Sequence, residues 1–239
     1  MKQVEYIKKA ILLMIVLGLL YTGITSVFGV QGATDIDVGV TSRANTSNWS
    51  SGQSTTVQAG NVTEINISGQ AITDHWAGFY GEISGSITLA NSDGNVFYNW
   101  TGLNTIAGEV FAANESTIGW GGIACADSGT ISSLNTWLGA AATDADTVNA
   151  TYTRNDHADF SVGGTALSSC NSTNAYTSSG AETTTFYQVL LKDGDGTPVF
   201  AAIINETTTG FDGNTHDFEL LVGEPEGAGT TMYFYIELD

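Results

Sequence analysis

Each of the three histidines in the chain has an aspartate beside it. The pairs are Asp74-His75, Asp156-His157 and His216-Asp217. Histidine and carboxylate together bind zinc, and a carboxylate orients a ligating imidazole. Adjacent residues on a strand point to opposite faces, however, so these pairs are not ready-made ligand pairs. No H-x-H or H-E-x-x-H spacing is present, so we expect polar histidines and no metal site.

Two turn sequences place oxygen ligands at alternating positions. Asp193 and Asp195 belong to DGDGT, and NSDGN spans residues 91–95. An EF-hand loop also needs a glutamate at its twelfth position, where these two loops have Ile204 and Gly102. Both segments are therefore predicted to be hairpin turns, because Asp-Gly tolerates the positive φ that such turns need. Asp193 and Asp195 remain weak calcium candidates.

No catalytic motif is recognisable. The sequence has no G-x-S-x-G elbow. A glycosidase needs two carboxylates at a fixed separation, and 25 acidic residues offer too many pairs to choose from. We therefore expect no enzyme activity and no cofactor, and a secreted hydrolase is the least favoured alternative.

The N-terminus has the order of a secretory signal peptide. Lys2, Lys8 and Lys9 precede the apolar run 10–20, and small residues follow around 29–33. Cleavage near residue 32 would leave residues 33–239 as a single domain, secreted or at the cell surface, with no stable membrane span. The alternative is an uncleaved anchor, because residues 10–30 are long enough to cross a bilayer.

The charge balance excludes nucleic acid as a partner. The formal net charge is −19, and after residue 32 the only basic residues are Arg43, Arg154 and Lys192. Such a chain repels phosphate backbones and stays soluble.

Cysteine and asparagine patterns both indicate an extracellular protein. Cys125 and Cys170 are expected to form one disulfide in an oxidising compartment, and two free thiols are the alternative. Several of the nine N-glycosylation sequons should lie on exposed loops or strand faces. The sequons begin at Asn45, Asn48, Asn61, Asn66, Asn99, Asn114, Asn149, Asn171 and Asn205.

Short runs of period two predict an all-β fold. Residues 36–40, 83–89 and 232–238 alternate apolar and polar positions. Many such runs indicate an antiparallel two-sheet sandwich, jelly-roll or Ig-like. One short helix is predicted around Leu134, Trp137 and Leu138, with its start capped by Ser132 or Ser133. We expect this helix to lie in an insertion that the disulfide pins to the sandwich.

The segment 74–100 raises the question of a site. Its part GSITLANSDGNVFYNW resembles residues 186–204, so both segments are predicted to be hairpins. His75 and Trp76 have no counterpart in the second segment, so any special role of the first is expected there. Val96, Tyr98 and Trp100 alternate onto one face and are expected in the core. Stacking of these aromatic rings on sugars is the alternative.

Residues 75–100, HWAGFYGEISGSITLANSDGNVFYNW, and the closing DFELLVGEPEGAGTTMYFYIELD together resemble archaeal secreted surface proteins. The resemblance covers about a third of the chain and carries over no catalytic residue. It implies an archaeal envelope protein, such as a filament or surface-layer component. We therefore expect a structural protein with copies of itself or other envelope components as partners. The alternative is a secreted module that binds carbohydrate or another small ligand.

The segment ATDIDVGVTSR follows the predicted signal peptide directly. Ile36, Val38 and Val40 have strand spacing. The segment is expected to be the first strand of its own sheet, with addition to a neighbouring copy as the alternative.

Overall fold

The computed structural model describes residues 34–35, 59, 62, 72–100, 106–225, 227 and 229–238. Gly32–Asp239 form one compact unit. The predicted signal peptide lies outside the described residues, as do Ile36, Val38 and Val40. Within the described part, no helix is both long and apolar enough to cross a membrane.

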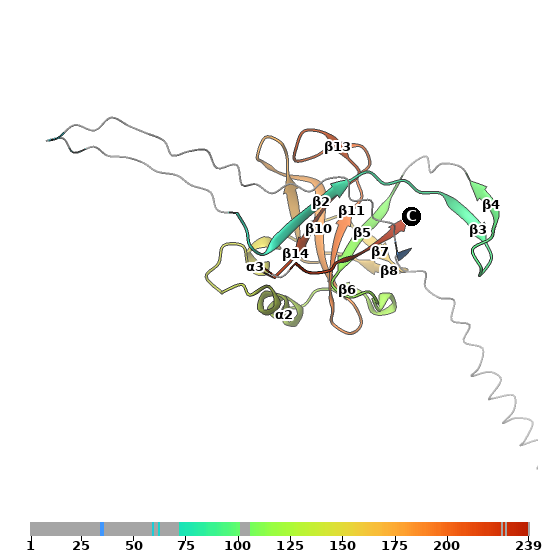
Figure 1. The fold of residues 1–239 in the computed structure, drawn as a ribbon, viewed down its shortest axis with the longest axis horizontal. Coiled ribbons are helices and arrows are strands. Elements are labelled where there is room, and N and C mark those ends of the chain that lie inside the picture. The colour runs from blue at the N-terminus through green and yellow to red at the C-terminus, as the bar shows by residue number, and fades with distance from the viewer. Residues whose placement is uncertain are drawn as a thin grey trace, which may run out of the picture. The chain divides into compact units, whose positions relative to one another are not determined.

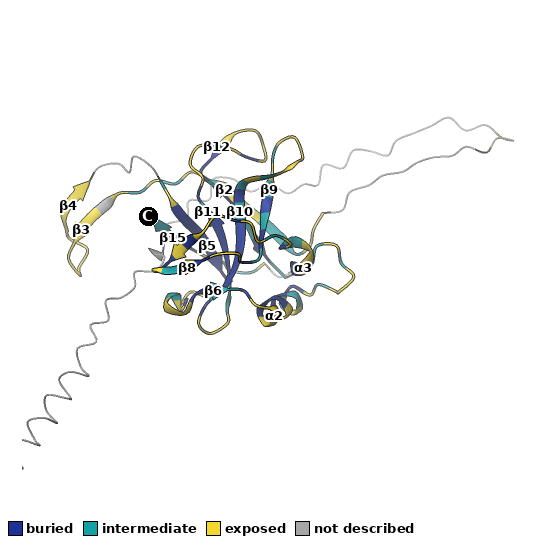
Figure 2. Cartoon of the chain, turned by 180° about the vertical axis from the view of Figure 1, so that it is seen from behind, coloured by how far each residue is buried: buried dark blue, intermediate teal, exposed yellow. Residues whose placement is uncertain are grey.

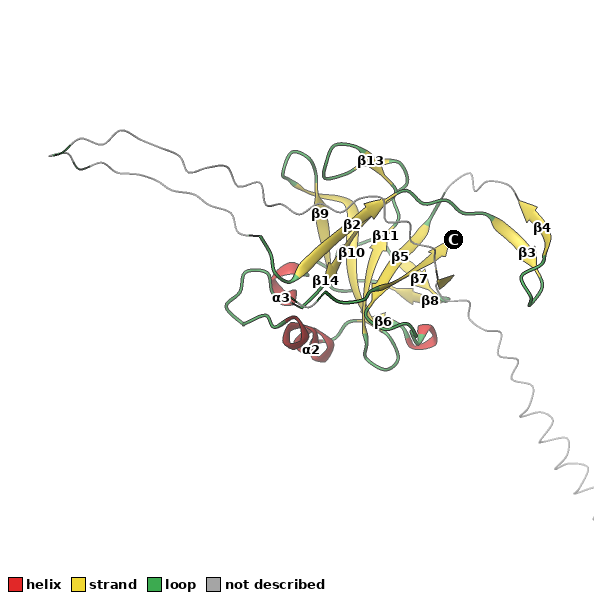
Figure 3. Ribbon diagram, viewed as in Figure 1, coloured by secondary structure: helices red, strands yellow, loops and turns green. Residues whose placement is uncertain are grey.

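The all-β prediction is confirmed: the described residues form antiparallel sheets with few helices (Figures 1 and 3). The strands are β1 (Thr34–Asp35), β2 (Trp76–Gly81), β3 (Ile87–Ala90), β4 (Val96–Trp100), β5 (Gly108–Ala113), β6 (Ala124–Cys125), β7 (Phe160–Val162), β8 (Thr165–Leu167), β9 (Ser172–Tyr176), β10 (Glu182–Lys192), β11 (Pro198–Ile203), β12 (Thr208–Thr209), β13 (Thr215–His216), β14 (Phe218–Gly223) and β15 (Tyr233–Leu238). The helical elements are η1 (Trp120–Gly122), α2 (Ser128–Leu138) and α3 (Val148–Thr151).

Seven of the described strands form a central sheet. Their order is β1-β15-β5-β11-β10-β6, and β9 pairs with β10 along the same edge as β6. All six residues of β5 are buried, as are four consecutive residues of β11. A strand buried on both faces loses the period-two pattern. This is why GEVFAA and PVFAAI contain adjacent apolar residues.

Each face of this sheet has its own apolar core. One core contains Phe111, Val189 and Tyr235 together with Phe160 and Val162 of β7. The opposite core contains Val110, Leu190 and Phe200 of the sheet, and it is covered by α2 and by β14. β14 pairs with β2 as a separate two-stranded sheet.

The sequence predicts that the segment closed by the disulfide is an insertion pinned to the sandwich. The structure contradicts this prediction. The Cys125–Cys170 bond is present, but the segment between the cysteines supplies residues to both cores. Leu134, Leu138 and Tyr152 belong to one core, and Phe160 belongs to the other. The segment completes the fold because a sheet buried on both faces needs a cover on each.

The predicted helix exists but begins earlier than expected. Asp127, rather than Ser132 or Ser133, is the N-cap of α2, and its side chain accepts a hydrogen bond from the Thr130 amide. Lys192 pairs with the same carboxylate. The hydrogen bonds from Lys192 and Thr130 lower the pKa of Asp127. Gly139, with φ of 77°, ends the helix, as left-handed C-caps do.

Candidate functional site

The edge of the central sheet joins the two ends of the described chain. Thr34 and Asp35 of β1 pair antiparallel with Ile236 and Tyr235 of β15. In Figure 1, β1 is the short dark blue arrow near the end marked C. Over these two residues, β1 therefore pairs within its own chain.

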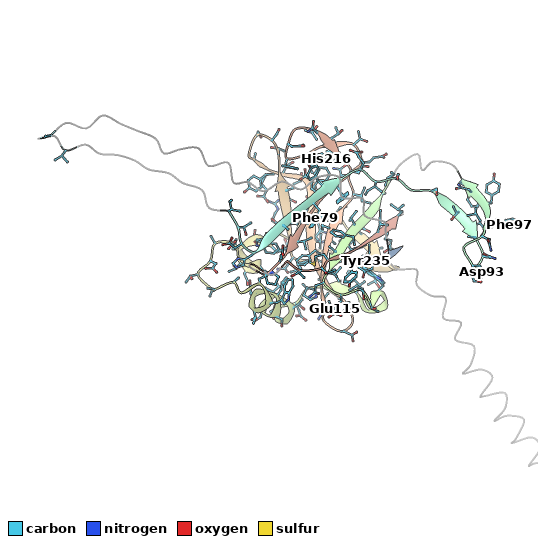
Figure 4. All side chains as sticks on the ribbon, in the orientation of Figure 1. Phe79, Asp93, Phe97, Glu115, His216 and Tyr235 are labelled. Carbon is cyan, nitrogen blue, oxygen red and sulfur yellow. A yellow bond between two sulfur atoms is a disulfide. The ribbon has the colours of Figure 1, made fainter. Side chains whose placement is uncertain are left out.

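β15 is fixed along the edge opposite β1 by its pairing with β5. It pairs with β5 over six residues, from Tyr233↔Ala113 to Leu238↔Gly108. The Tyr235 hydroxyl donates to the Glu115 carbonyl at 3.0 Å; both residues are labelled in Figure 4. β15 therefore offers a fixed template against which β1 is positioned.

One face of β15 is apolar but incompletely covered within the described residues. Met232, just before β15, and Phe234, Ile236 and Leu238 are all half-buried and pack at the margin of the core that α2 covers. The Phe234 ring contacts the Phe79 ring edge-on, with centroids 4.9 Å apart. Additional apolar side chains on this face would extend the core.

His75 and Trp76 both contact Asp146. The Trp76 indole donates to the Asp146 carbonyl at 2.6 Å, and His75 Nδ1 lies 3.2 Å from the Asp146 carboxylate. Hydrogen bonds from Thr73 and His75 lower the pKa of Asp146. These contacts tie the start of β2 to the loop before α3.

The other two histidines occupy different places. His157 Nε2 accepts from the Cys170 amide at 2.8 Å, while its Nδ1 lies 2.8 Å from the Ala158 carbonyl. His216 Nε2 lies 3.0 Å from the Asp212 carboxylate. Within the described residues, no three or more His, Cys, Asp or Glu side chains gather closely enough to hold a metal ion.

The two predicted Asp-Gly turns have the same hydrogen-bond pattern. The Asp193 Oδ1 accepts from the Asp195 and Thr197 amides at 2.9 and 2.8 Å, and its Oδ2 accepts from the Gly119 amide at 3.1 Å. Burial opposes ionisation of Asp193, but these amides lower its pKa overall. The Asp193 side chain is buried and holds the turn through these hydrogen bonds. Asp195, the second weak calcium candidate, is exposed.

Asn91 organises the other turn in the same way. Its Oδ1 accepts from the Asp93 and Asn95 amides at 3.2 and 2.8 Å. Gly94 and Gly196 occupy equivalent positions, with φ of 80° and 89°. The sequence correspondence between the two hairpins therefore reflects shared turn chemistry.

Five of the nine sequons lie within the described residues. Asn99, Asn149 and Asn205 are exposed, and Asn114 and Asn171 are half-buried. Asn45, Asn48, Asn61 and Asn66 lie outside the described residues.

A cavity of about 600 Å³ lies beside β14. Its lining includes the rings of Tyr80, Tyr176 and Phe211 and the carboxylates of Glu182 and Glu219. Burial raises the pKa of Glu219, whose Oε1 accepts from the Phe211 amide at 2.8 Å.

Gln188 was not identified from the sequence. It is buried in β10, where its Nε2 donates to the Glu219 carbonyl at 2.5 Å and its Oε1 accepts from the Leu221 amide at 2.7 Å. The side-chain amide thus bonds β14 as a neighbouring peptide group would. A lone glutamine in the run FYQVLLK was the available signal, because a polar residue inside a buried strand must find partners.

No protein-family model, curated protein or solved structure matches the chain. Its own geometry is therefore the basis for a functional proposal.

Proposed function

We propose that this protein is an extracellular structural protein that assembles with copies of itself, as a filament or an envelope layer, by adding β1 and the residues after it to β15 of a neighbouring copy. The observation that carries the proposal is the pairing of Thr34 and Asp35 with Ile236 and Tyr235. A terminal strand held at a sheet edge is an element that two copies can exchange.

The register supports a longer strand than β1. In an antiparallel pair, directly opposed residues share a face, so Thr34 lies on the face of Ile236. Ile36, Val38 and Val40 have the same parity as Thr34. In an extended pairing, Ile36 would oppose Phe234 and Val38 would oppose Met232. Their apolar side chains would then complete the half-buried margin of the core.

Exchange between copies costs few contacts. The same main-chain hydrogen bonds and side-chain contacts form whether the strand comes from its own chain or from another. The 31 residues between Val40 and Ile72 span at most roughly 100 Å when extended, so the strand can reach a neighbour. Such a head-to-tail contact produces a filament where its rotation does not close into a ring.

The remaining expectations belong to the same proposal. The disulfide and the exposed sequons at Asn99, Asn149 and Asn205 suit a secreted glycoprotein, and the sequence resemblance suggests an archaeal envelope. The β2–β14 pair over the central sheet supports a sandwich architecture, which an added strand would extend. The role is structural, without catalysis.

Deleting residues 33–43 tests the proposal. The intact protein is expected to form filaments by negative-stain microscopy, while the shortened chain stays folded and monomeric. An intact protein that remains monomeric at high concentration, together with a deletion that unfolds the domain, would show that the strand acts only within its own chain.

The cavity beside β14 supports a second candidate function, the binding of a neutral sugar. Ring faces of Tyr80 and Tyr176 beside the Glu219 carboxylate provide stacking surfaces and a hydrogen-bond acceptor. A glycan array should then detect binding that Tyr80→Ala removes. Binding by both proteins, or by neither, would argue against this site.

A further inference from the structure

The hairpin formed by β3 and β4 exposes the side chains that we expected in the core. Tyr98 is 56% exposed and Trp100 is 49% exposed. Leu89, on the partner strand, is 51% exposed. In Figure 2 the ribbon of β3 and β4 is yellow, the colour of exposed residues, wherever burial is described. Tyr98 and Trp100 share a face, as alternation predicts. Val96 does not join them, because the register shifts after Leu89 and sets Val96 opposite Ala90. No described element covers the face of Tyr98 and Trp100.

This hairpin has two chemically different faces. Leu89 opposes Tyr98, so these residues share a face, and the Tyr98 and Trp100 rings meet with centroids 4.8 Å apart. Thr88 opposes Asn99 on the other face. Asn99 begins a sequon, so an attached glycan would keep that face in water and leave the apolar face available.

We propose that the apolar face of this hairpin is covered by the same face of a second copy of the chain. A two-stranded sheet alone is marginally stable, and packing a second sheet against its apolar face stabilises it. Two hairpins in face-to-face contact bury equivalent residues around a two-fold axis. This contact is separate from strand addition at β15, and it would join filaments side by side.

The charge of the hairpin favours a copy of the chain as the partner. The chain carries a net charge of −19, so most pairs of surfaces on two copies repel each other. Residues 87–100 contain a single charged residue, Asp93, which lies in the turn (Figure 4). Two copies can therefore approach through this hairpin with little repulsion.

The chemistry of the face favours protein over sugar. Sugar sites combine a ring face with several convergent polar groups. Leu89 offers none, and the polar groups among the three side chains are the Tyr98 hydroxyl and the Trp100 indole N–H. An apolar face of this kind is instead typical of protein contacts.

The size of the face sets the strength of the contact. Each of the three half-exposed side chains presents roughly 100 Å². A total on the order of 300 Å² is below the roughly 800 Å² per partner of a standard stable interface. The contact is therefore weak between two free copies and strong where many copies are aligned.

Thiol cross-linking of the full-length protein tests the contact. Packed sheets stand about 10 Å apart, so a bis-maleimide of similar reach should join copies of Tyr98→Cys into covalent dimers. Thr88→Cys, exposed on the opposite face, is the matched control and should give at least tenfold fewer dimers. Cys125 and Cys170 are bonded to each other and do not react. Adding Trp100→Ser to Tyr98→Cys should reduce the yield to the level of the control.

Equal yields at the two positions would overturn the proposal. So would the absence of cross-linking together with quenching of tryptophan fluorescence by soluble oligosaccharides that Trp100→Ser removes. Deleting residues 33–43 separates this contact from strand addition. The Tyr98→Cys cross-link should still form above the Thr88→Cys control in that variant, at a lower yield because the contact between free copies is weak. Filaments without the cross-link would refute this contact alone. The cross-link without filaments would refute strand addition alone.

Discussion

Thr34 of β1 is the direct antiparallel partner of Ile236 in β15. These residues lie near the two ends of the described chain, so the pairing joins the two strands of the sheet that are furthest apart in the sequence. β15 is independently fixed by β5 and by the hydrogen bond from Tyr235 to Glu115. The template for β1 therefore persists when β1 leaves, which is the condition for exchanging this strand between copies.

Replacing Gln188 with Leu should destabilise the fold strongly. The change leaves the Glu219 carbonyl and the Leu221 amide without the partner that the Gln188 side chain provides. Each buried unsatisfied group costs about 1–3 kcal/mol, so we expect a loss of roughly 2–5 kcal/mol in urea unfolding. Thr184→Ala, an exposed change on the same strand, is the control. A loss below about 0.5 kcal/mol for Gln188→Leu would mean that these bonds contribute little to stability.

Replacing Gly196 with Val should destabilise through backbone strain alone. Gly196 has φ of 89°, and a Cβ at this position would meet no atom within 4 Å. A β-branched residue resists positive φ, at a cost of about 1–2 kcal/mol. Gly78→Val in β2 is the matched control, since its Cβ also has open space and its φ is not in the strained range. An equal change in melting temperature for the two variants would contradict this explanation.

Removing the disulfide should cost about 4 kcal/mol in the chain-entropy model, given the 45-residue separation of Cys125 and Cys170. Denaturant unfolding of a Cys125→Ser/Cys170→Ser variant measures this cost. Peptide mapping without reductant should recover the two cysteines in one linked fragment. Free thiols in that map would refute the bond.

Glu219 is expected to make the folded state less stable as pH rises. Burial raises its pKa above 4.5 in the folded state, so the folded protein binds this proton more tightly than the unfolded chain does. Its contribution to stability therefore decreases as pH rises from about 4.5 through the raised pKa. Glu219→Gln should raise the melting temperature at neutral pH and have little effect near pH 3.5.

Asp212 provides the control of opposite sign. Hydrogen bonds from Asn214 lower its pKa to about 2, so its stabilising contribution is present at neutral pH and is lost as pH falls through that value. Asp212→Asn should therefore lower the melting temperature at neutral pH, with a difference that shrinks in acid. Shifts of the same sign for the two variants would contradict these assignments.

Local chemistry was predictable from the sequence, whereas burial by distant segments was not. The turns at Asn91 and Asp193 followed from short-range residue types, and the disulfide followed from there being two cysteines. The cap at Asp127 was missed because the first turn of α2, residues 128–130, lacks the large apolar side chains whose spacing predicts a helix. Exposure of Tyr98 and Trp100 could not be read from alternation, which predicts a shared face but not its cover. The role of Gln188 depends on β14, which is 30 residues further along the chain.

Disulfide trapping between copies tests strand addition most directly. One preparation carries Thr34→Cys and a second carries Ile236→Cys, so that neither chain can form the new bond within itself. Opposed residues of an antiparallel pair are within disulfide reach. We predict mixed dimers linked through residues 34 and 236 after co-assembly and oxidation, and only background levels when Asp195→Cys, exposed in a turn, replaces Ile236→Cys. Mixed dimers no more abundant than this background would show that β1 serves only its own chain.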